Sequence, residues 1–281
     1  MEKYLTSALN SSNAAYRGIT FEPFVAYLLA RAFSVPKRLS EVFNFPDGSR
    51  LNAMLEDELA KLVALTKGDN GFTTTPFQIH EKLRSNHILG HSPSTNAGTL
   101  KWLQNPKGSV FCYPANTVGP DLMFILRLKS DDTVLRVCVQ CKHVTDLTKA
   151  ALEKAVRTTN PAYFLSQEKK ADDSPVCSNQ SMRGEMEEAF KNLGNGSKKA
   201  GQYGLLQVIA SYPSIPASHI LEDAAGKGQP LATFEVNLQE PNDDPLGQAI
   251  LLLANRALLR PDHKRRISDE AEGARPKRQR T

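Results

Sequence analysis

The sequence predicts an α/β domain, and the order of its apolar segments supports that class. A helical pattern near the N-terminus precedes three strand-like segments at 109–113, 121–128 and 133–144. A second helical pattern follows the third strand directly, and LLQVIASYP then forms a fourth strand-like segment. Helix, three strands, helix and strand therefore make up the predicted core, with insertions after the first helix and before the fourth strand.

The first helix is predicted to begin at Thr20. Thr20 is a suitable capping residue, and Pro23 would be tolerated because it would lie in the first turn. The helical spacing is carried by six apolar residues: Phe21, Phe24, Val25, Leu28, Leu29 and Ala32.

The remaining elements are predicted from the spacing of apolar residues and from turn-forming residues between them. The turn KSDD between two apolar runs predicts a hairpin, and HSPSTNAG is rich in turn residues. Further helices are predicted over 55–67, 76–89, 146–159, 182–193 and 246–259, and late strands over 205–213 and 231–238.

Composition limits the class of protein. The chain has 281 residues, of which 40% are hydrophobic and 23% charged, as in ordinary globular domains. It has no apolar run of about 18 residues, so no membrane span is expected, and its first residues lack the pattern of a secretory signal. Four cysteines are too few for a secreted disulfide scaffold, which favours a reducing, intracellular compartment.

We predict one domain over 1–260, with a core at 16–33 and 105–212 and insertions at 35–105 and 158–203.

The C-terminal segment 261–281 is basic and poor in apolar residues, and we expect it to be disordered. It holds seven Lys/Arg and four Asp/Glu, a charge of +3, which leaves +2 of the total +5 for residues 1–260. Two basic clusters ten residues apart resemble a bipartite nuclear localisation signal, which predicts a nuclear protein that binds an import receptor. A solvated tail that contacts nucleic acid non-specifically is the alternative. The clusters contain Lys264, Arg265, Arg266, Lys277, Arg278 and Arg280.

Polar groups gather at one end of the predicted hairpin. Gln140 and Lys142 share one face of their strand, because side chains alternate along a strand. Asp121 begins the preceding antiparallel strand, so the three residues should converge at one edge of the sheet. An acid, an amide oxygen and an amine suit a hard divalent cation and a phosphate. The lysine would orient or deprotonate a water molecule and offset phosphate charge.

This arrangement resembles a known family. Pro120-Asp121, a spacer and Gln140-Cys141-Lys142 are similar to the motif of the PD-(D/E)XK nuclease superfamily, whose restriction-endonuclease-like fold has an αβββαβ core with a mixed sheet. RGITFE at 17–22 resembles the RGxxFE opening of the branch related to the Mrr restriction enzyme. Similar QxK domains occur in mobile-element and Crinkler-type conflict proteins, so the resemblance also suggests a role of that kind.

The resemblance implies a site and a reaction. Asp121 would be the principal ligand of Mg2+ (or Mn2+), Gln140 would replace the usual acid, and the backbone carbonyl of Cys141 would complete the coordination. Lys142 would act on the attacking water, and Glu22 would help to hold the metal. The implied activity is hydrolysis of phosphodiester bonds, with DNA favoured, and many nucleases of this fold form homodimers.

Each residue also has a simpler explanation. Asp121 after Gly-Pro suits a turn, Glu22 suits the first turn of a helix, and Lys142 suits a solvent-facing strand position. Cys138 and Cys141 form a CxxC, but three residues apart on a strand they face opposite sides and should not share a metal. A catalytically silent nucleic-acid-binding or adaptor module remains the main alternative to an enzyme.

Overall fold

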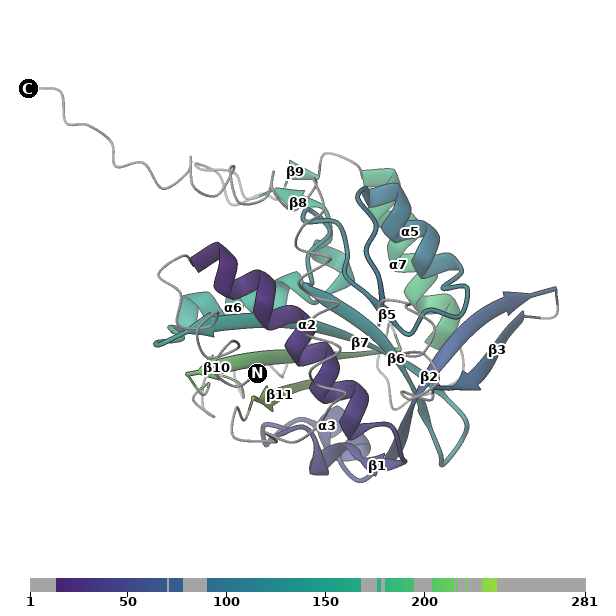
Figure 1. The fold of residues 1–281 in the computed structure, drawn as a ribbon, viewed down its shortest axis with the longest axis horizontal. Helices are drawn as coiled ribbons and strands as arrows, with labels where there is room; N and C mark the ends of the chain where they lie inside the picture. Colours follow the sequence, from purple (N-terminus) through teal and green to yellow (C-terminus); the bar gives the residue numbers. More distant parts are fainter. Residues whose placement is uncertain are drawn as a thin grey trace, which may run out of the picture.

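A central sheet organises the computed structural model, which describes residues 14–69, 71–77, 90–167, 176–177, 180–194, 204–214, 216, 221 and 229–236. The main path of the sheet follows the order β1-β2-β6-β7-β10-β11 (Figure 1). These strands span Lys37–Arg38, Leu59–Gly68, Leu122–Leu128, Val134–Val144, Leu205–Pro213 and Leu231–Glu235.

Short strands extend this sheet at its edges. β3 (Gly71–Pro76) pairs with β2, and β5 (Phe111–Cys112) pairs with both β6 and β4 (Gly90–His91). A separate two-stranded sheet consists of β8 (Ser166–Gln167) and β9 (Val176–Cys177).

The sheet is mixed, as expected. β6 runs antiparallel to both of its neighbours, β2 and β7. The chain then passes through α6 (Lys149–Thr158) and returns as β10, which runs parallel to β7. β11 is parallel to β10. A parallel neighbour requires such a crossover connection, whereas the β6–β7 hairpin needs only a short turn.

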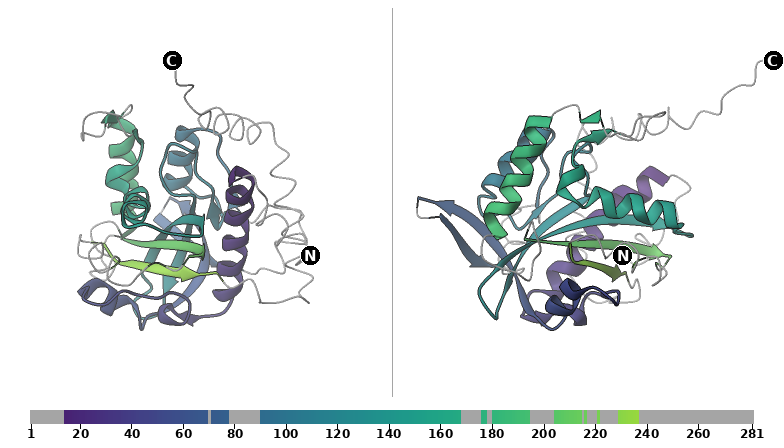
Figure 2. Two further views of the ribbon diagram at one scale, coloured as in Figure 1. Left: turned by 90° about the vertical axis from the view of Figure 1, so that its left-hand side faces the viewer. Right: turned by 180° about the vertical axis from the view of Figure 1, so that it is seen from behind.

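Helices cover both faces of the sheet (Figure 2). α2 (Ala14–Ala32) packs on one face. α5 (Asn96–Gln104) and α7 (Gln180–Gly194) pack on the other, together with α6. Three shorter helices complete the described elements: η1 (Leu39–Glu41), α3 (Arg50–Leu55) and η2 (Pro161–Tyr163).

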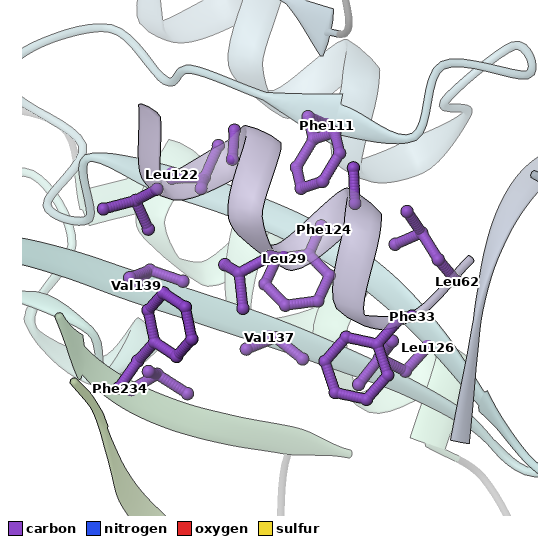
Figure 3. Packing of buried hydrophobic residues seen from close by; sticks show 14 of the residues in the cluster. Leu29, Phe33, Leu62, Phe111, Leu122, Phe124, Leu126, Val137, Val139 and Phe234 are labelled. Atoms are coloured by element: carbon purple, nitrogen blue, oxygen red, sulfur yellow. The ribbon is translucent and has the colours of Figure 1, made fainter. Parts of the chain in front are cut away.

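The larger hydrophobic core lies between α2 and the sheet (Figure 3). Leu29 of α2 and Phe33, which follows the helix directly, are fully buried against side chains of β6 and β7, among them Phe124 and Val137. Burial of a side chain of this size contributes about 1.5–3 kcal/mol. α2 is therefore held against the sheet mainly by its apolar face.

Arg136 connects the sheet to the two helices α5 and α7 on the face opposite α2. Its guanidinium, on β7, donates hydrogen bonds of 2.5 Å to the carbonyl oxygens of Leu103 in α5 and Ala189 in α7. It also lies 4.8 Å from the ring centre of Phe190. Removal from water lowers the pKa of Arg136 to about 9. These contacts bind two helices to one strand.

The first helix begins earlier than predicted. It starts at Ala14, so Thr20 lies inside it and does not cap it. Pro23 stands in the helix interior, where it removes one backbone hydrogen bond. Burial of Phe21, Phe24 and Val25 on either side of Pro23 offsets that loss.

The predicted helix at 55–67 is wrong, because this segment contains β2. Ala60, Leu62 and Ala64 face the core under α2, whereas Val63 and Leu65 face the opposite core. A strand buried on both faces is continuously apolar, and this pattern resembles that of a buried helix. The 35–105 insertion is therefore not purely helical, and it supplies a strand to the central sheet.

Other predictions have mixed outcomes. The β6–β7 hairpin, α6, α7, β10 and β11 are confirmed within a few residues. The strand predicted at 109–113 is only the two-residue β5, and α5 begins inside the predicted turn HSPSTNAG. Pro76 ends β3 and does not start a helix.

The predictions for 246–259 and for the tail 261–281 lie outside the described residues. Within the residues that are described, no helix is both long and apolar enough to cross a membrane.

Candidate active site at the β6–β7 edge

The register of two strands brings Asp121 beside Gln140. Leu122 pairs with Val139, so Asp121 stands opposite Gln140 across the ladder. The backbone N–H of Asp121 donates to the carbonyl oxygen of Val139 at 3.0 Å, which extends the pairing by one residue. The predicted convergence of these two side chains is confirmed.

The Asp121 carboxylate is held by two donors from β7. Its Oδ2 accepts a 2.8 Å hydrogen bond from the backbone N–H of Cys141. The same oxygen accepts a second hydrogen bond from Nε2 of Gln140. Hydrogen bonds to the ionised form stabilise a carboxylate.

Gln140 is buried, with 6% of its surface exposed, and both ends of its amide have partners. While Nε2 donates to Asp121, Oε1 accepts a 2.5 Å hydrogen bond from Oγ1 of Thr158. Thr158 is the last residue of α6, and its Oγ1 also lies 2.7 Å from the carbonyl oxygen of Ala155. Thr158 could not be predicted from the sequence, because only the packing of α6 brings it to β7.

The segment before Asp121 packs against the end of α6. Gly119 has φ +143°, and a Cβ added there would lie 2.5 Å from the carbonyl oxygen of Thr158. The backbone N–H of Leu165 donates to the carbonyl oxygen of Val118 at 3.2 Å. Glycine at 119 thus permits a close approach that seats Thr158 beside the candidate site.

Lys142 lies next to this group. It is partly buried and follows Gln140 by two positions, so the two residues lie on the same face of β7. Its positive charge acts on the thiol of Cys141, which places the ammonium near that residue.

Glu22 approaches from α2. Burial raises the pKa of the Cys141 thiol, the negative charges of Asp121 and Glu22 raise it further, and Lys142 opposes them. Burial also raises the pKa of Tyr113, again with a contribution from Glu22. Two carboxylates from different parts of the chain therefore act on one residue, Cys141.

The two cysteines of the CxxC lie on opposite faces of the sheet. Cys138 is part of the core beneath α5 and α7, whereas Cys141 packs toward the core beneath α2. The predicted orientation of the two side chains, on opposite sides of the strand, is confirmed. Cys112, Cys138 and Cys141 are all free thiols.

The donor set fits a hard divalent cation in one orientation of the Gln140 amide. In the described orientation Nε2 faces Asp121, and an N–H donor cannot act as a metal ligand. A half-turn of the amide would present Oε1 instead. Together with Asp121, Glu22 and the carbonyl oxygen of Cys141, it would offer the oxygen ligands that Mg2+ prefers.

The candidate centre contains few acids. Among the described residues, no group of three or more His, Cys, Asp or Glu side chains is arranged to hold a metal ion. A cation at this edge would depend on neutral oxygens from Gln140 and the main chain beside the two carboxylates.

The six basic residues of the predicted localisation signal lie outside the described part of the chain.

Comparison with known proteins does not assign this chain to a family. No protein-family model matches it, and neither the curated proteins nor the solved structures contain a significant match.

Proposed function

We propose that this protein is a metal-dependent nuclease with a restriction-endonuclease-like core. The observation that carries the proposal is the meeting of the Asp121 carboxylate, the Gln140 amide and the Cys141 backbone within hydrogen-bonding distance at one sheet edge. Lys142 follows directly on the same strand, in the position that the PD-(D/E)XK resemblance requires.

The order of elements supports the same proposal. α2, β2, β6, β7, α6 and β10 form a helix, three antiparallel strands, a crossover helix and a strand parallel to the third. In this proposal, that order corresponds to the αβββαβ core that the resemblance implies. β2 takes the place of the first strand, which the sequence had suggested was 109–113.

The residues have distinct roles in this proposal. Asp121, Gln140, Glu22 and the Cys141 carbonyl would hold Mg2+ or Mn2+, which supplies Lewis-acid polarisation of the phosphate and lowers the pKa of a water molecule. Lys142 would orient that water and offset negative charge on the scissile phosphate. The substrate class is nucleic acid, with DNA favoured, and homodimerisation would allow both strands to be cut.

A second candidate is a catalytically silent nucleic-acid-binding module. One observation favours it, because Gln140 satisfies Asp121 and Thr158 at once, so the polar cluster is complete without a cation. An amide in place of an acid also removes a negative charge that would attract a metal.

Plasmid nicking by the purified chain with Mg2+ or Mn2+ tests the first candidate. Asp121→Ala and Lys142→Ala should each abolish cleavage. Asp146→Ala and Lys129→Ala, which change exposed residues of the same charge, should leave it intact.

A silent wild type under all metals and substrates would reject the nuclease. If that silent protein bound DNA, and Asp121→Ala bound it equally well, the second candidate would stand.

A further inference from the structure

We infer that Thr158 is a positioning residue that holds the Gln140 amide in either of two orientations, one facing Asp121 and one facing a divalent cation. The inference rests on the metal site of the proposed function and adds a residue outside the motif. It is based on the hydrogen bonds at the two ends of the amide and on the way the end of α6 is held.

The first orientation is the one described above. Gln140 donates through Nε2 to Asp121, and the Thr158 hydroxyl donates to Oε1 at 2.5 Å. A hydroxyl has one proton and two acceptor lone pairs. While that proton points to Gln140, it is not directed at the carbonyl oxygen of Ala155, 2.7 Å away.

The second orientation exchanges these roles. After a half-turn of the amide, Nε2 would face Thr158, and the hydroxyl oxygen would accept its hydrogen bond. The hydroxyl proton would then be donated to the carbonyl oxygen of Ala155. Thr158 thus satisfies the amide in both states, and Oε1 is released toward the cation without leaving a buried polar group unpaired.

Thr158 is held firmly enough to act in this way. The Nε2 of the buried Gln207, on β10, donates to the carbonyl oxygen of Val156 at 3.1 Å and to Oγ1 of Thr159 at 3.0 Å. On the other side, Gly119 approaches the Thr158 carbonyl closely. The end of α6 is therefore fixed from the sheet and from the segment that carries Asp121.

Substitution separates positioning from packing. Valine nearly matches threonine in shape but can neither donate nor accept a hydrogen bond, so Thr158→Val would leave the inner end of the amide without a partner in both orientations. Thr158→Ser keeps the hydroxyl and should preserve the function. Thr148→Val is a matched control, because Thr148 caps the opposite end of the same helix.

The test is Mn2+ affinity of the full chain, measured by titration calorimetry on the wild type and the three variants. Thr158→Val should weaken Mn2+ binding about 10- to 100-fold, the usual effect of losing a partner that orients a metal ligand. Thr158→Ser should bind within about threefold of the wild type, and so should Thr148→Val despite its lower stability.

Three outcomes would overturn the inference. Equal affinity in the wild type and Thr158→Val would reject the role of Thr158 and leave the metal site standing. Equal weakening in Thr158→Val and Thr148→Val would reduce the effect to general destabilisation. A wild type that binds no Mn2+ would instead reject the metal site itself, and the inference with it.

Discussion

Gln140 determines the chemistry of the site at the scale of single residues. Its amide gives Asp121 a hydrogen bond that a carboxylate in the same place could not supply. The cluster is therefore hydrogen-bonded without a cation, and a cation at the proposed site would have to replace that hydrogen bond. An acid at this position would repel Asp121 when no metal is present and would attract a metal more strongly.

Replacing the Gln140 amide by a carboxylate should make the thermal stability of the protein depend on Mg2+. In EDTA at neutral pH, Gln140→Glu should lower the melting temperature, because two facing carboxylates in a buried site cost roughly 1–3 kcal/mol. Mg2+ should then raise the melting temperature of the variant more than that of the wild type, since tighter binding to the folded state stabilises it. Thermal unfolding with and without Mg2+ measures both effects.

A buried glutamine on the neighbouring strand provides the control for that experiment. Gln207→Glu should also lower the melting temperature, because Gln207 is 4% exposed, but Mg2+ should not restore it. An equal response to Mg2+ in Gln140→Glu and the wild type would count against a cation at Asp121.

At the scale of elements, local pattern predicted the site better than the rest of the sheet. The β6–β7 hairpin was predictable because a polar turn separates two apolar runs, and its pairing placed Asp121 opposite Gln140. β2 was not predictable, because LEDELAKLVALTK consists mostly of good helix formers, and only the pairing with β6 and β3 makes it a strand. Thr158 was missed for a related reason, since its contact with Gln140 depends on how α6 docks on the sheet.

The close contact at Gly119 gives a prediction about this docking. Gly119→Ala should lower the free energy of unfolding by about 1–3 kcal/mol, because φ is +143° and the new Cβ would meet the Thr158 carbonyl oxygen at 2.5 Å. Urea denaturation measures the loss.

Gly184→Ala is the matched change in an open position. Gly184 lies within α7, and a Cβ there would meet nothing within 4 Å. Alanine should therefore stabilise the protein by about 0.5–1 kcal/mol, as in other helix interiors. If Gly119→Ala were as stable as the wild type, the seating of α6 against the segment before Asp121 would need to be reconsidered.

At the scale of the whole molecule, the net charge differs between the domain, for which we propose nucleic-acid binding, and the C-terminal segment, for which we propose nuclear import. Residues 1–260 carry a net charge of only +2, so nucleic-acid binding by the domain would depend on local groups such as Lys142. The segment 261–281 carries a net charge of +3, and six of its seven basic residues form two clusters. We propose that this segment directs the protein to the nucleus through an import receptor, independently of the candidate active site.

Import can be measured apart from catalysis. Residues 261–281 fused to a fluorescent reporter too large to diffuse through nuclear pores should accumulate in nuclei. Alanine at Lys264, Arg265 and Arg266 should abolish that accumulation, because a bipartite signal needs both basic clusters. Alanine at Asp269, Glu270 and Glu272, which lie between the clusters, should preserve it. A tail that only contacts nucleic acid would instead leave the reporter in the cytoplasm and bind DNA with an affinity that falls steeply as salt rises. Full-length Asp121→Ala should still enter the nucleus, since its tail is unchanged. If this variant stayed in the cytoplasm, nuclear import would depend on the candidate active site.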